Sequence, residues 1–312
     1  MEYRRLGRSG IKVSAVGIGA NQIGGKVDLE MTRRILDRAL DLGVNFIDTA
    51  ATYTEGKSEE FLGEALKGRR DEFLVATKVG WPSPTDGPNE GRASRHFIMQ
   101  RVELSLRRLQ TDHIDLYQIH HWDADTPLEE TMRALDDLVR AGKVRYLGAS
   151  NFAAWQLCRA NDLAEMMHLT PFVSIQPHYN MMQREIEKEL APYARAFDIG
   201  ILPYRPLAGG FLTGKYAPGY IPPGSRGEFH EHVRSYFTER NFAIVEKLKA
   251  FAAERGRSMV ELAVAWLLAQ PQIASVINGV TTVEQLEQNV KAHTWHLTPE
   301  EDAELRSILE AQ

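Results

Sequence analysis

The feature that most constrains the fold of this chain is a regular alternation of short apolar segments with longer helical patterns. The segments are apolar on both faces, as expected for parallel strands covered by helices. The candidate strands are residues 13–18, 44–48, 73–79, 114–120, 146–149, 173–176, 200–204 and 275–280. The helical patterns lie near residues 30–42, 57–68, 94–109, 128–141, 153–168, 185–197, 239–255 and 258–269. Eight β-then-α units predict an α/β fold, a (β/α)8 TIM barrel, as one domain over residues 1–312.

The two ends of the chain and two long loops depart from this alternation. Residues 3–13 have the pattern of a β-hairpin that turns at residues 7–10, and we expect it to cap the bottom of the barrel. Loops at residues 81–92 and 217–236 are expected at the C-terminal rim, where loops of such length are usually functional. Two further helical patterns, 283–292 and 299–310, close the chain.

Composition excludes several classes of function. The net charge is −5 with no basic block, so the sequence predicts neither a nucleic-acid partner nor a polybasic membrane contact. The first five residues lack the apolar core of a signal peptide, and the longest apolar run, 262–269, is too short to span a bilayer. The expected compartment is therefore the cytoplasm. Cys158 is the single cysteine, which excludes an internal disulfide; its helical context predicts a small core residue.

Four polar residues, Asp48, Tyr53, Lys78 and His120, follow the ends of predicted strands. Because the strand ends of a parallel barrel meet at one rim, these side chains are expected to converge in one pocket. A tyrosine can transfer a proton, a nearby ammonium lowers its pKa, and a carboxylate keeps the ammonium charged. The alternative is a structural Asp–Lys pair, with Tyr53 and His120 only packing the rim.

Several segments around these residues resemble the signatures of aldo-keto reductases. They are residues 45–53 (NFIDTAATY), 76–78 (ATK), 115–120 (DLYQIH), 148–152 (GASNF), Gln176 and 207–216 (LAGGFLTGKY). The resemblance extends from the N-terminal hairpin to about Asn289, and is strongest to bacterial members near the general-stress and sugar-metabolism branches. It implies reversible, NADPH-dependent reduction of aldehydes or ketones to alcohols. Hydride would come from nicotinamide C4 and the proton from Tyr53.

The resemblance also implies a role for each residue of the catalytic group. Tyr53 is expected to be the general acid–base and Lys78 to tune it, with Asp48 orienting Lys78. His120 is expected to bind the carbonyl oxygen. The neighbouring His121 points the opposite way on a strand, and it does not directly follow the Tyr-Gln-Ile segment.

The cofactor residues are carried over from the same resemblance. Ser150, Asn151 and Gln176 are expected to bind the carboxamide, and Tyr204 to stack on the nicotinamide ring. The segment from Gly209 to Lys215 resembles a nucleotide-triphosphate loop, but Tyr216 replaces the hydroxyl residue that would bind magnesium. The other residues expected to contact the cofactor are Arg205, Leu207, Gly209, Leu212, Lys215, Gly279, Gln285 and Asn289.

Some positions differ from the usual pattern of the family. Thr281 and Thr282 stand where a basic residue commonly meets the adenosine 2′-phosphate, and Arg226 or Lys291 could substitute. NADP(H) is favoured over NAD(H). Asn21 stands where many members have a tryptophan, which predicts a roomier or more polar pocket.

Three aromatic residues are candidate walls of the substrate pocket. They are Trp81, Trp122 and Phe211, with core packing as the alternative. His230, Glu231 and His232 offer metal-binding atoms but no third histidine, so a solvated loop is favoured and no metal site is predicted.

Three rival functions remain open at this level. One is a non-catalytic or slow nicotinamide-binding regulatory subunit of the same fold, as in potassium-channel β-subunits. A second is an NAD-dependent sugar dehydrogenase. The third treats Lys78 as a Schiff-base nucleophile in an aldolase barrel.

Overall fold

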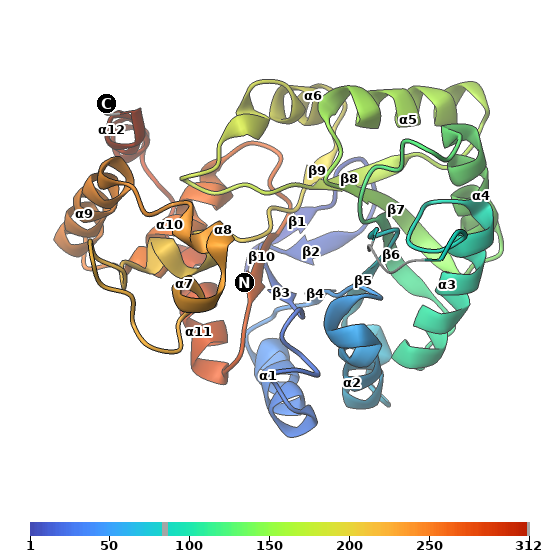
Figure 1. The fold of residues 1–312 in the computed structure, drawn as a ribbon, viewed down its shortest axis with the longest axis horizontal. Helices are drawn as coiled ribbons and strands as arrows, with labels where there is room; N and C mark the ends of the chain where they lie inside the picture. Colours follow the sequence, from blue (N-terminus) through green and yellow to red (C-terminus); the bar gives the residue numbers. More distant parts are fainter. Residues whose placement is uncertain (83–86, 311–312) are drawn as a thin grey trace.

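Eight parallel strands form the centre of the molecule, and helices surround them (Figure 1). The computed structural model describes residues 1–82 and 87–310. The strands are β3 (Val16–Gly19), β4 (Phe46–Asp48), β5 (Leu74–Val79), β6 (Ile114–Ile119), β7 (Val144–Ser150), β8 (Phe172–Gln176), β9 (Gly200–Ile201) and β10 (Val276–Gly279). Their order is β10-β3-β4-β5-β6-β7-β8-β9. Parallel bridges from Ile201 to Ile273 and from Tyr204 to Ile277 join the two ends of the sheet. The predicted (β/α)8 barrel is confirmed.

The helices follow the predicted alternation. They are α1 (Leu29–Asp41), α2 (Lys57–Ala65), α3 (Arg95–Leu109), α4 (Leu128–Arg140), α5 (Ala154–Met166), α6 (Leu190–Ala196), α9 (Glu239–Glu254), α10 (Met259–Ala269), α11 (Val283–Lys291) and α12 (Pro299–Glu310). The expected helix at 185–197 is broken into a 3-10 turn, η3 (Glu185–Glu187), and α6. Pro192 lacks a backbone N–H and is tolerated only in a first turn, so the helix has to begin just before it.

The predicted N-terminal hairpin is present and caps one end of the barrel. Strand β1 (Tyr3–Arg5) pairs antiparallel with β2 (Lys12–Ser14). Leu6 and Val13 are fully buried, and they pack against inward-facing barrel residues such as Leu116. Gly7 has φ +54°, and a Cβ there would lie 2.3 Å from the Val173 carbonyl oxygen, so the turn requires glycine. The expected strand 13–18 is therefore wrong at its start: Val13 belongs to the hairpin, and β3 begins at Val16.

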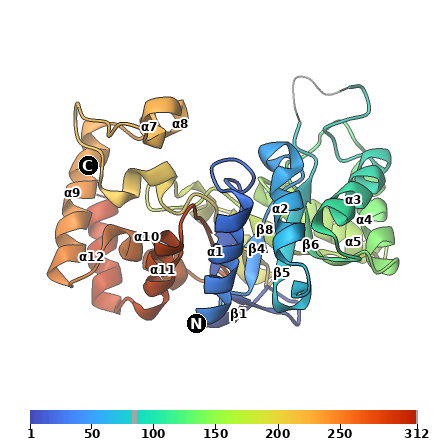
Figure 2. The same ribbon diagram turned by 90° about the horizontal axis from the view of Figure 1, so that it is seen from below.

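The loop predicted at 217–236 contains two short helices. They are α7 (Arg226–Phe229) and α8 (Glu231–Arg234), and Figure 2 shows both standing out from one end of the barrel. His230 and His232 lie together in this region, with ring centroids 5.3 Å apart. The described residues contain no group of three or more His, Cys, Asp or Glu side chains that could hold a metal ion.

Cys158 does not lie in the core, contrary to the sequence expectation. It is only partly buried on α5, and its Sγ is 3.5 Å from Asp162 Oδ2. The buried face of α5 instead includes Leu157 and Ala160, so Cys158 falls beside that face. Among the described residues, no helix is long and apolar enough to cross a membrane.

Candidate active site

A cavity of about 1220 Å³ lies at the carboxyl ends of the barrel strands. All four predicted catalytic residues line it, together with the pocket candidates Asn21 and Trp81. The expected cofactor residues that line it are Ser150, Asn151, Gln176, Tyr204, Arg205, Leu207, Gly209, Lys215, Gly279, Gln285 and Asn289. Residues that are far apart in the sequence therefore share one cavity, because most of them end or follow strands of the same barrel, whereas Gln285 and Asn289 come from α11.

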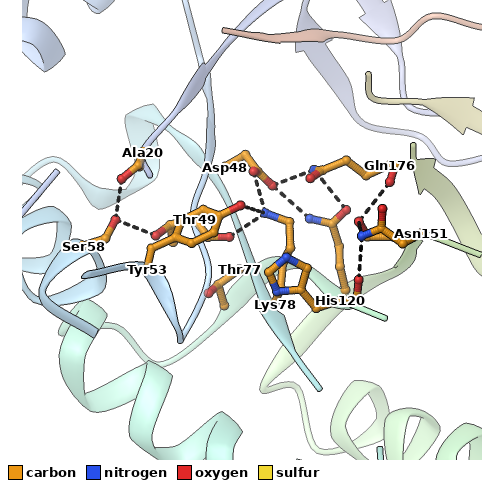
Figure 3. Close-up of polar contacts among 12 residues, drawn as sticks. Ala20, Asp48, Thr49, Tyr53, Ser58, Thr77, Lys78, His120, Asn151 and Gln176 are labelled. Carbon is orange, nitrogen blue, oxygen red and sulfur yellow. Dashed lines mark hydrogen bonds and ion pairs between the residues drawn. The ribbon is translucent and has the colours of Figure 1, made fainter. Parts of the chain in front are cut away.

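Lys78 is the centre of a group of polar side chains that line this cavity (Figure 3). Its Nζ donates to Asp48 Oδ2 at 2.6 Å, to the Thr49 carbonyl oxygen at 2.9 Å and to the Tyr53 hydroxyl at 3.3 Å. Lys78 and Asp48 are almost completely buried. Three acceptors thus satisfy the three N–H donors of one buried ammonium.

The second carboxylate oxygen of Asp48 binds two amide side chains. Gln176 Nε2 donates to Asp48 Oδ1 at 2.8 Å, and Gln118 Nε2 donates to the same atom at 3.0 Å. Gln118 was not among the predicted site residues. The period-two alternation of β6 places it on the same face as His120, which is the signal that could have identified it.

The electrostatics of the cavity keep Lys78 charged and Tyr53 protonated at neutral pH. Burial lowers the pKa of Lys78, but Asp48 and Tyr53 together more than offset this, so the net change is upward. Burial raises the pKa of Tyr53 above its ordinary value, and the Lys78 ammonium opposes that rise. Lys78 thus lowers the pKa of Tyr53, as the residue types predict, but burial raises this pKa by more.

The loop after β4 holds Tyr53 in place through an unusual backbone. Thr54 and Glu55 follow Tyr53 with φ values of 48° and 60°, in the left-handed region that non-glycine residues rarely adopt. The Thr54 hydroxyl donates to the Ile23 carbonyl oxygen at 2.8 Å. This bond ties the loop to the β3–α1 connection and offsets part of the strain.

His120 faces the cavity, whereas His121 is exposed outside it. The His120 ring lies 6.0 Å from the Tyr53 ring and 4.6 Å from the Trp81 ring, measured between centroids. Burial, followed by the nearby Lys78 charge, lowers the pKa of His120 to about 2. The imidazole is therefore neutral at pH 7, and one of its nitrogens carries a hydrogen. Its Nδ1 is buried with no partner among the described residues.

A second polar group lies beside the catalytic group. The Tyr204 hydroxyl donates to Asn151 Oδ1 at 2.8 Å, and Asn151 Nδ2 donates to the His120 carbonyl oxygen and to Ser150 Oγ. One face of the Tyr204 ring is covered by His178, at 5.2 Å and an interplanar angle of 9°. Sequence reasoning missed His178, and its place in the chain gives no pattern that would have revealed it.

Three further basic residues contribute to the cavity. Arg205, Lys215 and Arg226 all line it. Burial lowers the pKa of Arg226, and charge repulsion from Arg205 lowers it further. Gly209 has φ +68°, and a Cβ there would lie 2.6 Å from the Val233 side chain, so this turn also requires glycine. Of the two candidate substitutes for the missing basic residue, Arg226 lines the cavity and Lys291 does not.

The structure places three expected residues elsewhere. Leu212 is fully buried beneath the glycine-rich turn and does not line the cavity. Trp122 packs edge-on against Phe152 and Trp155, at 5.2 and 5.6 Å between ring centroids, because it lies two residues beyond His120 on the outer part of the rim. Phe211 belongs to an aromatic cluster with Tyr216, Tyr236, Phe237 and Phe242. Trp122 and Phe211 are therefore not walls of this cavity.

Comparison with known proteins agrees with this geometry. Residues 15–310 match the model of the aldo/keto reductase family. An uncharacterized oxidoreductase of Bacillus subtilis, YrpG, is 40% identical over 94% of this chain and 91% of its own length. The aldo-keto reductase YhdN of the same organism is 36% identical, over 99% and 94%. A probable voltage-gated potassium channel subunit beta of Oryza sativa is 36% identical, over 94% and 91%.

The barrel, the cavity at its rim and these matches define an NAD(P)H-dependent oxidoreductase. The chain belongs to the aldo/keto reductase family. This confirms the resemblance on which the residue roles were predicted.

Proposed function

We propose that the chain acts as a single domain that reversibly reduces aldehydes or ketones to alcohols, with NADP(H) in preference to NAD(H). The observation that carries the proposal is the position of Lys78 Nζ, 2.6 Å from Asp48 Oδ2 and 3.3 Å from the Tyr53 hydroxyl, in the wall of an open cavity. A structural ion pair needs no tyrosine hydroxyl at this place, whereas a proton-transfer site does.

Each residue has a distinct part in the proposed reaction. Reduction of a carbonyl builds negative charge on its oxygen, and Tyr53 donates the proton that neutralises it. The Lys78 ammonium stabilises the phenolate that remains, and Asp48 keeps the ammonium in place. The neutral His120 donates its ring N–H to the same carbonyl oxygen. When bound, the reduced nicotinamide supplies the hydride.

The residues present fit a dinucleotide. Amide and hydroxyl side chains of Ser150, Asn151 and Gln176 suit a carboxamide, and Tyr204 offers an aromatic face whose back is supported by His178. The basic residues suit a diphosphate. Ser225 Oγ and Asn278 Oδ1 are buried in the cavity lining without a partner among the described residues, and both can bind polar atoms of a ligand.

The main rival is a regulatory subunit that binds the cofactor and turns over slowly. This rival is considered because one similar protein is named as a probable potassium channel subunit beta. Stopped-flow oxidation of NADPH with a panel of small aldehydes, diketones and sugars separates the two. We expect sustained turnover after the first cycle; a single burst without steady turnover favours the rival.

Cofactor preference is expected to depend on Arg226. Arg226→Ala should weaken NADPH binding about tenfold or more, because hydrogen bonds to a charged group are worth more than neutral ones, and should change NADH binding much less. Lys291→Ala, which removes an exposed lysine outside the cavity, is the matched control and should change neither. Fluorescence titration measures both affinities. Equal affinities of the unmodified protein for NADPH and NADH would defeat the preference for NADP(H).

A further inference from the structure

One wall of the cavity comes from α3 and from Trp81, which lies just after β5. We call Trp81, Phe97, Arg101 and Arg108 the α3 wall; all four line the same cavity as Tyr53 and His120. Trp81 contacts the His120 ring, so this wall begins beside the proposed reaction centre. Phe97, Arg101 and Arg108 lie four and seven residues apart and share one face of α3.

The two arginines of this wall differ in their partners. Arg108 Nη1 lies 3.3 Å from Glu59 Oε2 and 3.3 Å from the Ala51 carbonyl oxygen, so its charge is matched by a buried carboxylate. Arg101 has no hydrogen bond or ion pair within the described part of the chain. Its Nε is buried without an acceptor, and its guanidinium lies 4.7 Å from the centroid of the Phe97 ring.

A partly buried guanidinium without an acceptor is unusual, and it suggests that a ligand supplies the acceptor. It cannot lose its proton, and a donor that is buried without an acceptor costs free energy. Contact with the Phe97 ring supports the charge but accepts no conventional hydrogen bond. Arg101 therefore presents donors in a fixed fork to whatever occupies this part of the cavity.

We propose that Arg101 binds a carboxylate carried by the carbonyl substrate, so that acidic aldehydes or ketones are the preferred substrate class. This inference rests on the proposed function of the same cavity. One unmatched positive charge fits a monoanion, and the planar fork of a guanidinium fits the two oxygens of a carboxylate. The aromatic faces of Trp81 and Phe97 provide an apolar path for the carbon skeleton between the carbonyl group and the carboxylate.

Two carboxylates line the described part of this cavity: Asp48, which is paired with Lys78, and Glu55, which opposes the proposal. Glu55 is exposed, and it forms no ion pair with Arg101 among the described residues. Its negative charge repels an acidic substrate. Glu55→Gln is accordingly expected to increase the preference for acidic substrates.

The test uses a matched pair of substrates that differ in charge but hardly in shape, 4-formylbenzoate and 4-formylbenzamide. The unmodified enzyme with NADPH is expected to favour the benzoate in kcat/KM by about tenfold or more. Arg101→Met keeps an apolar side chain on Phe97 and should abolish this preference, because kcat/KM should fall much more for the benzoate than for the benzamide. Arg101→Lys should retain part of it. Arg107→Met removes the same charge from an exposed position of α3 and should change nothing.

A binding measurement separates this inference from the proposed function. Calorimetric titration with 4-methylbenzoate, which has no carbonyl or hydroxyl group that could react with NADP⁺, should show about tenfold weaker binding to Arg101→Met in the presence of NADP⁺. Loss of binding in the variant, without turnover of either aldehyde by the unmodified enzyme, would refute the proposed reaction and support the carboxylate site. Equal kcat/KM for the two aldehydes, or an equal loss of both in Arg101→Met, would overturn the carboxylate site.

Discussion

Tyr53→Phe is expected to reduce carbonyl turnover by at least about 100-fold while NADPH binding stays near that of the unmodified protein. The substitution removes the only group that we assign as proton donor. It should hardly disturb the fold, because Lys78 keeps its bonds to Asp48 and to the Thr49 carbonyl oxygen. Steady-state oxidation of NADPH measures the turnover, and fluorescence titration measures the binding.

Tyr117→Phe is the matched control for this variant. Tyr117 is fully buried, its hydroxyl has no partner among the described residues, and it does not line the cavity. Its substitution should leave turnover unchanged. Unchanged turnover in Tyr53→Phe would refute the acid assignment, and equal losses in both variants would indicate a general effect on folding.

The barrel could be predicted from sequence because its signals are local and repeated. Each strand is a short run that is apolar on both faces, and each helix has caps such as Ser258, whose side chain and Glu261 form a capping box. The first residue of a strand could not be predicted where two strands share one apolar run. Val13 looks like part of the first barrel strand, but it pairs with Arg4 in the hairpin.

The convergence of the four catalytic candidates could also be predicted, since it follows from barrel geometry alone. Packing partners within the rim could not. Trp122 and Trp81 carry the same sequence signal, an aromatic residue just after a strand, yet Trp81 contacts His120 and Trp122 packs against Phe152. Which way such a side chain turns depends on neighbours from other β/α units. The stacking of His178 on Tyr204 is hidden for the same reason.

The sequence also could not predict which effect on the pKa of Tyr53 is the largest. The residue types predict that Lys78 lowers the pKa of Tyr53, and the contact at 3.3 Å supports that effect. Burial raises the pKa by more, and burial of one hydroxyl depends on the whole rim. The protonated form that results is the one that reduction requires.

Asp48→Asn is expected to destabilise the protein by about 3–5 kcal/mol and to reduce turnover strongly. Asp48 accepts from Lys78, Gln118 and Gln176, and all these groups are buried. The amide has nearly the same shape but no charge, so the Lys78 ammonium stays buried without a counter-ion. Its NH₂ group also has to face either the ammonium or the two glutamine amides, which are donors as well. Denaturant unfolding measures the loss of stability.

The double variant Asp48→Asn, Lys78→Met separates stability from catalysis. Replacing a buried ion pair by uncharged groups of similar volume is often neutral, whereas removing one partner is costly. We therefore expect the double variant to recover most of the lost stability and none of the lost turnover. Glu185→Gln, which breaks the exposed pair with Lys188, is the control and should leave stability unchanged. Recovery of turnover together with stability would show that the Asp48–Lys78 pair only holds the barrel together, because a pair that tunes Tyr53 has to be present for the proton to move.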